Sequence, residues 1–209
     1  MPDLAPPGSQ ASSLPPGPLP HKGWYSRGYI PHCDYPDLIQ GITFRLWDSL
    51  PAHVVASLSA DLRETDDPAR RARVEAYLNA GYGACYLRDP RIARLVEGAL
   101  LYFDGQRYRL IAWVIMPNHV HTLIETIEGY PLRSITHSWK SYTAKQANQI
   151  LGRTGRFWFP EYFDRYIRNE RHLEAAIHYI HENPVKAGLV EEPEDWPFSS
   201  ARLLRAGCP

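Results

Sequence analysis

The sequence of 209 residues predicts an α+β sandwich in which helices pack on a mostly antiparallel sheet. Segments with strand and helix patterns follow one another in the order strand, helices, strand, strand, helix, strand, helix. Two of these strands are separated by only a tight turn, which makes them antiparallel neighbours. Hydrophobic residues make up 44% of the chain, which is enough for a sizeable core.

The beginning of the chain differs in composition from the rest. Residues 1–20 contain seven prolines, and such a segment buries too little apolar surface to offset the entropy lost on ordering. We therefore expect a disordered, proline-rich tail over residues 1–22. The remainder, residues 23–209, is expected to form a single domain with a C-terminal extension.

The first strand is expected at residues 38–47, LIQGITFRLW, where β-forming residues dominate. Pro51 then begins a helical region, because apolar residues recur there at helical spacing: Val54, Val55, Leu58 and Leu62. The pattern over residues 66–100 is mostly helical, with a break around Gly81 and Gly83.

A hairpin is predicted in the middle of the chain. Residues 107–116, RYRLIAWVIM, are nearly continuous in apolar character, as in a strand that is covered on both faces. The pattern alone leaves a buried helix open. Pro117 and Asn118 form turns readily, and residues 119–126, HVHTLIET, predict the second strand.

Two helices and a strand are expected in the last third. The helix over residues 132–150 carries an apolar stripe and ends at Gly152 and Gly155. This stripe consists of Leu132, Ile135, Trp139, Tyr142 and Ile150. Residues 157–168 are rich in aromatics and include a further strand. The pattern over residues 170–183 predicts a helix that Pro184 and Gly188 stop.

Composition narrows the classes of protein. Lys plus Arg equal Asp plus Glu, with 23 of each, which argues against a uniformly basic DNA coat but not against local basic patches. Cys33, Cys85 and Cys208 form no CxxC pair, so neither a zinc module nor a disulfide framework is expected. We find no apolar run of membrane-spanning length and no signal-peptide pattern. A cytoplasmic protein with reduced thiols and no membrane partner is expected.

His119 and His121 are candidate metal ligands. They are two residues apart on a predicted strand, so both imidazoles point to the same face of the sheet. Two neutral imidazoles at this spacing can hold one divalent cation. Two hydrogen-bonded histidines on a sheet face explain the pattern about equally well, because a single HxH pattern is short.

Two tyrosines are candidates for a nucleophile, and each lies one helical turn before an amide. Tyr142 precedes Gln146 and Tyr179 precedes Asn183, so each pair shares one helix face. The apolar stripe around Tyr142 favours a core position, whereas Tyr179 flanks the stripe of its own helix. Asn183 is alternatively a helix C-cap before Pro184. A free phenol has a pKa of about 10, so a tyrosine nucleophile needs help at pH 7.

These motifs resemble those of REP-associated tyrosine transposases, which are single-tyrosine HUH endonucleases. Residues 116–121, MPNHVH, are similar to the HUH motif. Other similar segments are GWYSRGYIPH at 23–32, ITFRL at 42–46, FWFPEYFDRYIRN at 157–169, HYIHENPVKAGLV at 178–190 and DWPFSSAR at 195–202. The resemblance covers most of the chain after the tail.

The resemblance implies a ferredoxin-like HUH sandwich that cuts and rejoins single-stranded DNA at REP-type hairpins through a covalent 5′-phosphotyrosine. It implies Tyr179 as the nucleophile. It implies His119, His121 and Asn183 as ligands of Mg²⁺ or Mn²⁺, although related transposases often have Gln at the position of Asn183. A monomer is favoured, while insertion-sequence relatives act as dimers.

Basic residues gather between residues 131 and 171, where eight Lys or Arg face three Asp or Glu. Aromatic residues lie among them, and this mixture suits phosphate contacts and base stacking, although most of the aromatics are expected in the core. Another basic and aromatic segment lies at residues 22–29. The residues expected to contact DNA are Arg27, Lys140, Arg165 and Arg168.

Two other functions remain open. One is a catalytically silent, sequence-specific DNA-binding protein of the same fold. The other is a metal-dependent hydrolase of a small phosphoester, which would need more carboxylates near the histidine pair. On their strand only Glu125 shares the face of His119 and His121. This ranks the hydrolase low and makes Glu125 a candidate partner of a ligating histidine.

Overall fold

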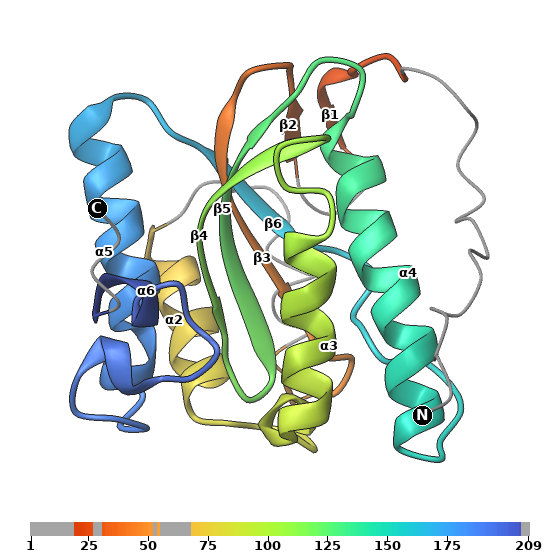
Figure 1. Cartoon of the computed structure of the whole chain (residues 1–209), viewed down its shortest axis with the longest axis vertical. Helices are drawn as coiled ribbons and strands as arrows, with labels where there is room; N and C mark the ends of the chain where they lie inside the picture. The colour runs from red at the N-terminus through yellow and green to blue at the C-terminus, as the bar shows by residue number, and fades with distance from the viewer. Residues whose placement is uncertain (1–18, 27–30, 52–53, 55–67, 206–209) are drawn as a thin grey trace, which may run out of the picture.

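The computed structural model describes residues 19–26, 31–51, 54 and 68–205. Its centre is a four-stranded antiparallel sheet with the strand order β4-β5-β3-β6 (Figure 1). The strands are β3 (Ile39–Arg45), β4 (Tyr108–Ile115), β5 (His119–Thr126) and β6 (Phe163–Tyr166). The helices are α2 (Pro68–Asn79), α3 (Pro90–Leu101), α4 (Leu132–Ile150), α5 (Glu170–Lys186) and α6 (Arg202–Arg205), with short 3-10 turns at Tyr86–Arg88 and Pro193–Asp195. The predicted α+β class is confirmed.

The central hairpin has the bounds that the apolar runs predicted, to within a residue. β4 and β5 pair from Tyr108 with Thr126 to Ile115 with Val120. A register shift between Leu110 and Ala112 marks a β-bulge, which changes the face to which the later side chains of β4 point. Both strands are buried over most of their length because helices cover both sides of the sheet.

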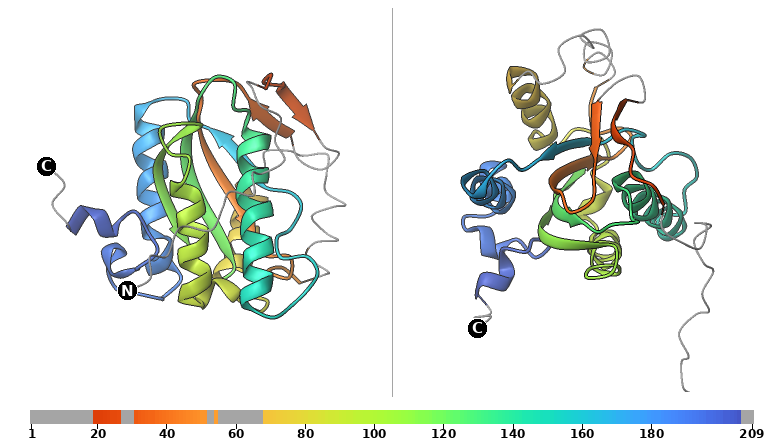
Figure 2. Two further views of the ribbon diagram at one scale, coloured as in Figure 1. Left: turned by 45° about the vertical axis from the view of Figure 1, so that its right-hand side comes forward. Right: turned by 90° about the horizontal axis from the view of Figure 1, so that it is seen from above.

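Different helices cover the two faces of the sheet, as the view from above in Figure 2 shows: α3 and α4 lie on one side, α2 and α5 on the other. The α3/α4 face holds the larger apolar core, which includes Phe44, Tyr108 and Trp139. The opposite face contains a smaller cluster in which Leu123 of β5 packs against Ile180 of α5. The α2/α5 face therefore has fewer apolar residues in its core than the α3/α4 face.

A second, two-stranded sheet lies at one end of the molecule and was not predicted. β1 (Gly23–Ser26) pairs antiparallel with β2 (Pro31–Asp34). His32 of β2 is fully buried and connects this hairpin to the main sheet through Asp164 and Glu161. Its ring also lies 4.5 Å from that of Tyr162. These long-range contacts stabilise two strands that are too short to be read from pattern alone.

The end of α5 differs from the expected stop at Pro184. The helix continues to Lys186 with Pro184 inside it, and Gly188 follows with a positive φ of 66°. The amide of Ala187 still donates to the carbonyl of Asn183, so the helix closes one more turn after the proline. Asn183 is thus a helical residue one turn before the end, and the C-cap interpretation of Asn183 is wrong.

Some expectations concern residues outside the described part of the chain. These include most of the expected tail, Arg27, and Val55, Leu58 and Leu62 of the helical pattern after Pro51. Val54, at the start of that pattern, is buried with Leu50 and Leu78. Among the described residues, no helix has the length and apolar character to cross a membrane.

Candidate active site

The two histidines of β5 are buried and face the side of the sheet covered by α2 and α5. Their side chains are 0% and 3% exposed for His119 and His121, and their ring centroids lie 4.7 Å apart. His119 Nδ1 donates to Asn118 Oδ1 at 2.7 Å. His121 Nδ1 lies 2.7 Å from the Thr43 hydroxyl. Because both Nδ1 atoms have partners, the Nε2 atom of each ring is left to meet a ligand.

His119 is in the protonation state that a metal ligand requires. Its burial, together with the neighbouring charge of His121, lowers its pKa to about 3. The ring is therefore neutral at pH 7, and the hydrogen bond to Asn118 keeps the proton on Nδ1. The lone pair of Nε2 is directed away from that bond and is available to a cation.

Glu75 of α2 brings a carboxylate to the histidine pair. The ligand atoms of Glu75, His119 and His121 all lie within 4.8 Å of one another. Glu75 Oε1 is 3.3 Å from His121 Nε2. Burial raises the pKa of Glu75, but His121, His119 and a hydrogen bond from Tyr179 outweigh burial and hold that pKa at about 2. Glu75 is thus ionised at neutral pH.

Tyr179 lies on α5, and its ring faces the same group. Its centroid is 5.5 Å from that of His121 at a steep interplanar angle of 79°. Burial, and then the negative charge and hydrogen bond of Glu75, raise the pKa of Tyr179 well above its ordinary value. The phenol is therefore neutral at pH 7, and the Glu75 carboxylate is the acceptor beside it.

Asn183, one turn after Tyr179, contributes a fourth polar group. Its side chain is buried, and its Nδ2 donates to the carbonyl of Tyr179 at 3.4 Å. Within the described part of the chain, four buried atoms of this site make no hydrogen bond: His119 Nε2, Asn183 Oδ1, and the ion-pair atoms Glu75 Oε1 and His121 Nε2, which face each other at 3.3 Å. Buried polar atoms without a partner are costly, and all four are ligand atoms of the kind that divalent cations take. These residues fit a metal ion.

Two expectations, one about the histidine face and one about α4, are wrong. Glu125 is far along the strand from the histidines, and its carboxylate pairs with Arg109 at 3.0 Å instead of with a ligand. Tyr142 is 53% exposed on α4 instead of buried in the core. The buried stripe of α4 is centred on a neighbouring line of residues, which includes Trp139, Thr143 and Ala147.

Glu75 was missed in the sequence because it lies on a polar helix with no motif around it. The buried neighbours Val74 and Leu78 show which side of α2 faces the sheet, and Glu75 is next to that side. Which acid this helix brings to β5 depends on how α2 docks, which no local spacing encodes. Glu75 therefore supplies, from a different element, a carboxylate beside the histidine pair that the strand pattern did not predict.

The residues expected to contact DNA lie in different places. Arg165 on β6 and Arg168 just after it are exposed, and the guanidinium of Arg168 covers the ring of Tyr166 at 5.4 Å. Arg165 shares the histidine face of the sheet, since its partner Gly41 is two residues from Thr43. Arg27 lies outside the described residues.

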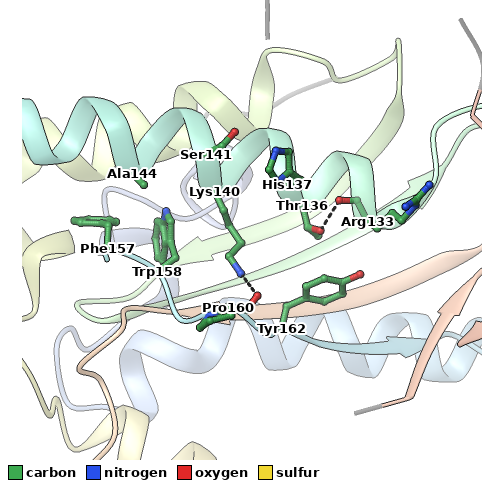
Figure 3. Close-up of a pocket in the computed structure, with 10 residues that line it drawn as sticks. All are labelled: Arg133, Thr136, His137, Lys140, Ser141, Ala144, Phe157, Trp158, Pro160 and Tyr162. Carbon is green, nitrogen blue, oxygen red and sulfur yellow. Dashed lines mark hydrogen bonds between the residues drawn. The ribbon is translucent and has the colours of Figure 1, made fainter. Parts of the chain in front are cut away.

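Lys140 lies on the other side of the sheet, on α4. Its Nζ donates to the carbonyl oxygens of Phe159 and Pro160 at 2.7 and 2.6 Å. It lines a pocket of about 310 Å³ between α4 and the segment before β6, together with His137 and Trp158 among others (Figure 3). The structure does not bring Lys140 to the histidine site.

The chain is similar to several known proteins. The family model described as "Transposase IS200 like" matches residues 88–183, which include both histidines and Tyr179. A REP-associated tyrosine transposase of Escherichia coli (strain K12) is 32% identical over 93 residues, which are 44% of this chain and 54% of that protein. A candidate REP-associated tyrosine transposase of Haemophilus influenzae is 30% identical over 104 residues, covering 44% of this chain and 58% of that protein.

These matches span about half the length of the curated relatives. A solved structure of a REP-associated tyrosine transposase bound to a REP hairpin superposes with a TM-score of 0.51 and 22% identity. The superposition covers 88% of this chain and 87% of that one. At this identity the structural likeness supports the fold alone.

Proposed function

We propose that this chain, which is similar to REP-associated tyrosine transposases over part of its length, is a metal-dependent single-stranded DNA endonuclease and strand transferase. Its substrate is DNA with REP-like hairpins, and its intermediate is a 5′-phosphotyrosine. One observation carries the proposal: the buried, unpartnered ligand atoms of Glu75, His119, His121 and Asn183 lie around the phenol of Tyr179.

Tyr179 is the proposed nucleophile. Its oxygen attacks the scissile phosphorus, a new P–O bond forms to the tyrosine, and the bond between phosphorus and the 3′ oxygen breaks. The phenol proton is balanced by the proton that the departing 3′ oxygen takes up to become a hydroxyl. Attack of that hydroxyl, or of another 3′ hydroxyl, on the phosphotyrosine reverses the exchange and rejoins strands without ATP.

The chain's own residues prepare this reaction. Glu75 accepts the hydrogen bond of the Tyr179 phenol and is the group able to take its proton. Asn118 and Thr43 orient the two imidazoles through their Nδ1 atoms. The proposed ligands of Mg²⁺ or Mn²⁺ are His119 and His121, with Asn183 and Glu75 as candidates for further positions. When bound, the cation polarises the phosphate oxygens.

The DNA partner is proposed from charge and position. Arg165 and Arg168 are exposed near the site and suit phosphate contacts. Arg27 and Lys140 remain proposals for contacts away from the site, with Arg27 near the β1–β2 hairpin along the chain. A monomer acting in the cytoplasm, where chromosomal DNA is accessible, completes the proposal.

A covalent-adduct assay tests the nucleophile. Single strands that span inverted repeats flanking the gene are labelled at the 3′ end and incubated with the protein and Mn²⁺. An adduct that resists denaturation is expected on a gel, because the tyrosine keeps the 5′ phosphate of the labelled fragment. Tyr179→Phe is expected to abolish this adduct, and Tyr142→Phe, which alters an exposed tyrosine before an amide, to leave it unchanged. An adduct that persists in Tyr179→Phe contradicts the assignment.

The same assay separates the other functions. Hairpin binding without any adduct favours a catalytically silent DNA-binding protein. The carboxylate of Glu75 beside the histidines removes the main argument against a hydrolase of small phosphoesters. Metal-dependent turnover of bis(p-nitrophenyl) phosphate that survives Tyr179→Phe, with no adduct on DNA, would favour that hydrolase.

A further inference from the structure

Arg45, at the end of β3, is a buried cation that the proposed reaction does not yet use. Its side chain is 5% exposed. Burial lowers its pKa to about 10, which still leaves it charged at pH 7. Its hydrogen bonds come from Nη1 alone, to the Leu46 carbonyl at 3.4 Å and the Ser49 hydroxyl at 3.2 Å. Among the ion pairs of the described residues none includes Arg45, although buried charges are ordinarily paired.

The position of Arg45 relates it to the active site. In the β3–β5 ladder Arg45 is directly opposite His119, and Thr43 is opposite His121. Residues that pair directly across two antiparallel strands share a face and have Cα atoms about 4.5–5.5 Å apart. The Thr43 hydroxyl indeed reaches His121 on that face. The Arg45 guanidinium, which forms no ion pair with another described residue, therefore lies on the histidine side of the sheet, one strand away from the proposed metal ligands.

A stack of flat groups continues from Arg45 toward solvent. The guanidinium carbon of Arg45 is 3.6 Å from the ring centroid of Phe159. Phe159 stacks on Trp47 with centroids 5.7 Å apart and planes 27° apart. The guanidinium of Arg156 covers the Trp47 ring at 4.5 Å. We call these four residues the Arg45 strip: Arg45, Phe159, Trp47 and Arg156.

Backbone hydrogen bonds hold the strip in place. The amide of Phe159 donates to the Arg45 carbonyl, and the amide of Trp47 donates to the Phe157 carbonyl, both at 2.9 Å. Asp48, the nearest acid in sequence, instead accepts a hydrogen bond from the Ala84 amide. At the outer end Trp47 is 42% exposed and Arg156 is exposed. A rigid, positive, aromatic surface thus leads away from the histidines.

We propose that the Arg45 strip is a subsite for an unpaired nucleotide next to the scissile phosphate, with that nucleotide's phosphate on the Arg45 guanidinium and its base on Trp47. This inference rests on the proposed function. A phosphate supplies the missing anionic partner of Arg45. A base can replace the exposed guanidinium of Arg156 on the indole, because both are flat groups that stack on a π face.

The test measures binding without cleavage. In a Tyr179→Phe background without metal, the binding of fluorescein-labelled oligothymidine is followed by anisotropy over a series of NaCl concentrations. Arg45→Gln is expected to lower the slope of log K against log salt by about 0.7, the value for one lost phosphate contact with a single strand. Trp47→Ala is expected to weaken binding roughly 5- to 150-fold with little change in slope, as for one lost base stack.

Arg109→Gln is the matched control, because it removes one exposed arginine at the far end of the sheet, where Arg109 pairs with Glu125. Arg109→Gln is expected to leave the slope of log K against log salt unchanged. If the slope falls as much in Arg109→Gln as in Arg45→Gln, the fall is a general effect of charge and the proposed subsite is overturned. Thermal melting checks that Arg45→Gln folds. If Arg45→Gln does not fold, the Trp47→Ala and Arg156→Gln variants provide the test, because both residues are exposed. The proposal is overturned if both variants bind oligothymidine as tightly as the wild-type protein does.

The outcomes also separate this inference from the proposed function. If binding depends on the Arg45 strip but the protein never forms the covalent adduct, the proposed subsite is supported and the proposed endonuclease activity is contradicted. The opposite result is that the wild-type protein forms the adduct, while Trp47→Ala and a folded Arg45→Gln variant bind DNA unchanged. That result contradicts the proposed subsite and supports the proposed endonuclease activity.

Discussion

The two faces of the main sheet differ in how their buried aromatic and imidazole groups are hydrogen-bonded. On the α3/α4 face, aromatic donors have partners: Trp139 Nε1 donates to the Tyr108 hydroxyl at 2.9 Å, and that hydroxyl donates to the Leu100 carbonyl. Trp158 Nε1 likewise donates to the Thr143 hydroxyl. On the α2/α5 face, the ligand atoms around His119 and His121 have none.

This difference indicates that one face of the sheet mainly stabilises the fold and that the other is arranged to bind a ligand. Satisfied donors within an apolar core contribute to stability and require nothing from outside the protein. Unsatisfied acceptors gathered in one place cost stability until a ligand meets them. The α3/α4 face is therefore expected to control folding independently of any cation, and the α2/α5 face to respond to one.

The largest expected effect is on the α3/α4 face. Trp139→Ala removes a buried indole that stacks on Phe44 and contacts Tyr108. We expect the free energy of unfolding to fall by about 3–5 kcal/mol, measured by urea denaturation. The loss is expected to be the same with and without Mn²⁺. A loss that depends on the cation would break the division between the two faces.

The α2/α5 face is expected to respond to a cation. If Mn²⁺ is present at 100 times its Kd, the native state gains about 2.7 kcal/mol by mass action. His121→Ala is expected to reduce this gain strongly in thermal or urea unfolding. His137→Ala, which removes an exposed histidine on α4, serves as the matched control and should keep the gain. An undiminished gain in His121→Ala would contradict the proposed centre.

The further ligand can be identified in the same measurement. Glu75→Gln removes the negative charge of one candidate ligand, and Asn183→Ala removes the amide oxygen of the other. The variant with the larger loss of Mn²⁺ stabilisation marks the group that binds the cation more strongly. Because Glu75 is ionised and Asn183 is neutral, we expect the larger loss for Glu75→Gln.

The smallest expected effect is at Tyr108. Tyr108→Phe leaves the Trp139 indole donor without an acceptor, which is expected to cost about 1–3 kcal/mol at neutral pH. Burial raises the pKa of Tyr108 to about 12, so the buried phenol resists ionisation. Its stabilising effect is fully present below pH 10 and is lost as the pH rises from 10 toward 12.

Urea unfolding below and above pH 10 checks this dependence. The difference in unfolding free energy between the wild-type protein and Tyr108→Phe is expected to shrink above pH 10. A difference that stays constant with pH would show that the Tyr108 phenol does not stabilise the fold through its neutral form.

Local patterns predicted several elements with accurate bounds. The continuous apolar run and the Pro117–Asn118 turn predicted β4 and β5, because short-range sterics and burial decide a tight hairpin. The helix over residues 132–150 matches α4. Tyr142 was misplaced because a helical stripe read from spacing alone has an uncertain centre. Pro184 was misread as a stop because a proline removes only one N–H···O bond of the helix, and the amide of Ala187 still bonds to the carbonyl of Asn183 beyond it.

What the sequence determined by itself are the relations set by backbone period: His119 and His121 on one face of a strand, and Tyr179 one turn before Asn183 on a helix. Tertiary structure alone decided that Glu75 joins them and that Arg45 lies opposite His119, in no ion pair with another described residue. These contacts link residues far apart in the chain. They follow from how α2, α5 and β3 pack on β5, and the free energy of that packing is spread over the whole apolar interface, not encoded in a local motif.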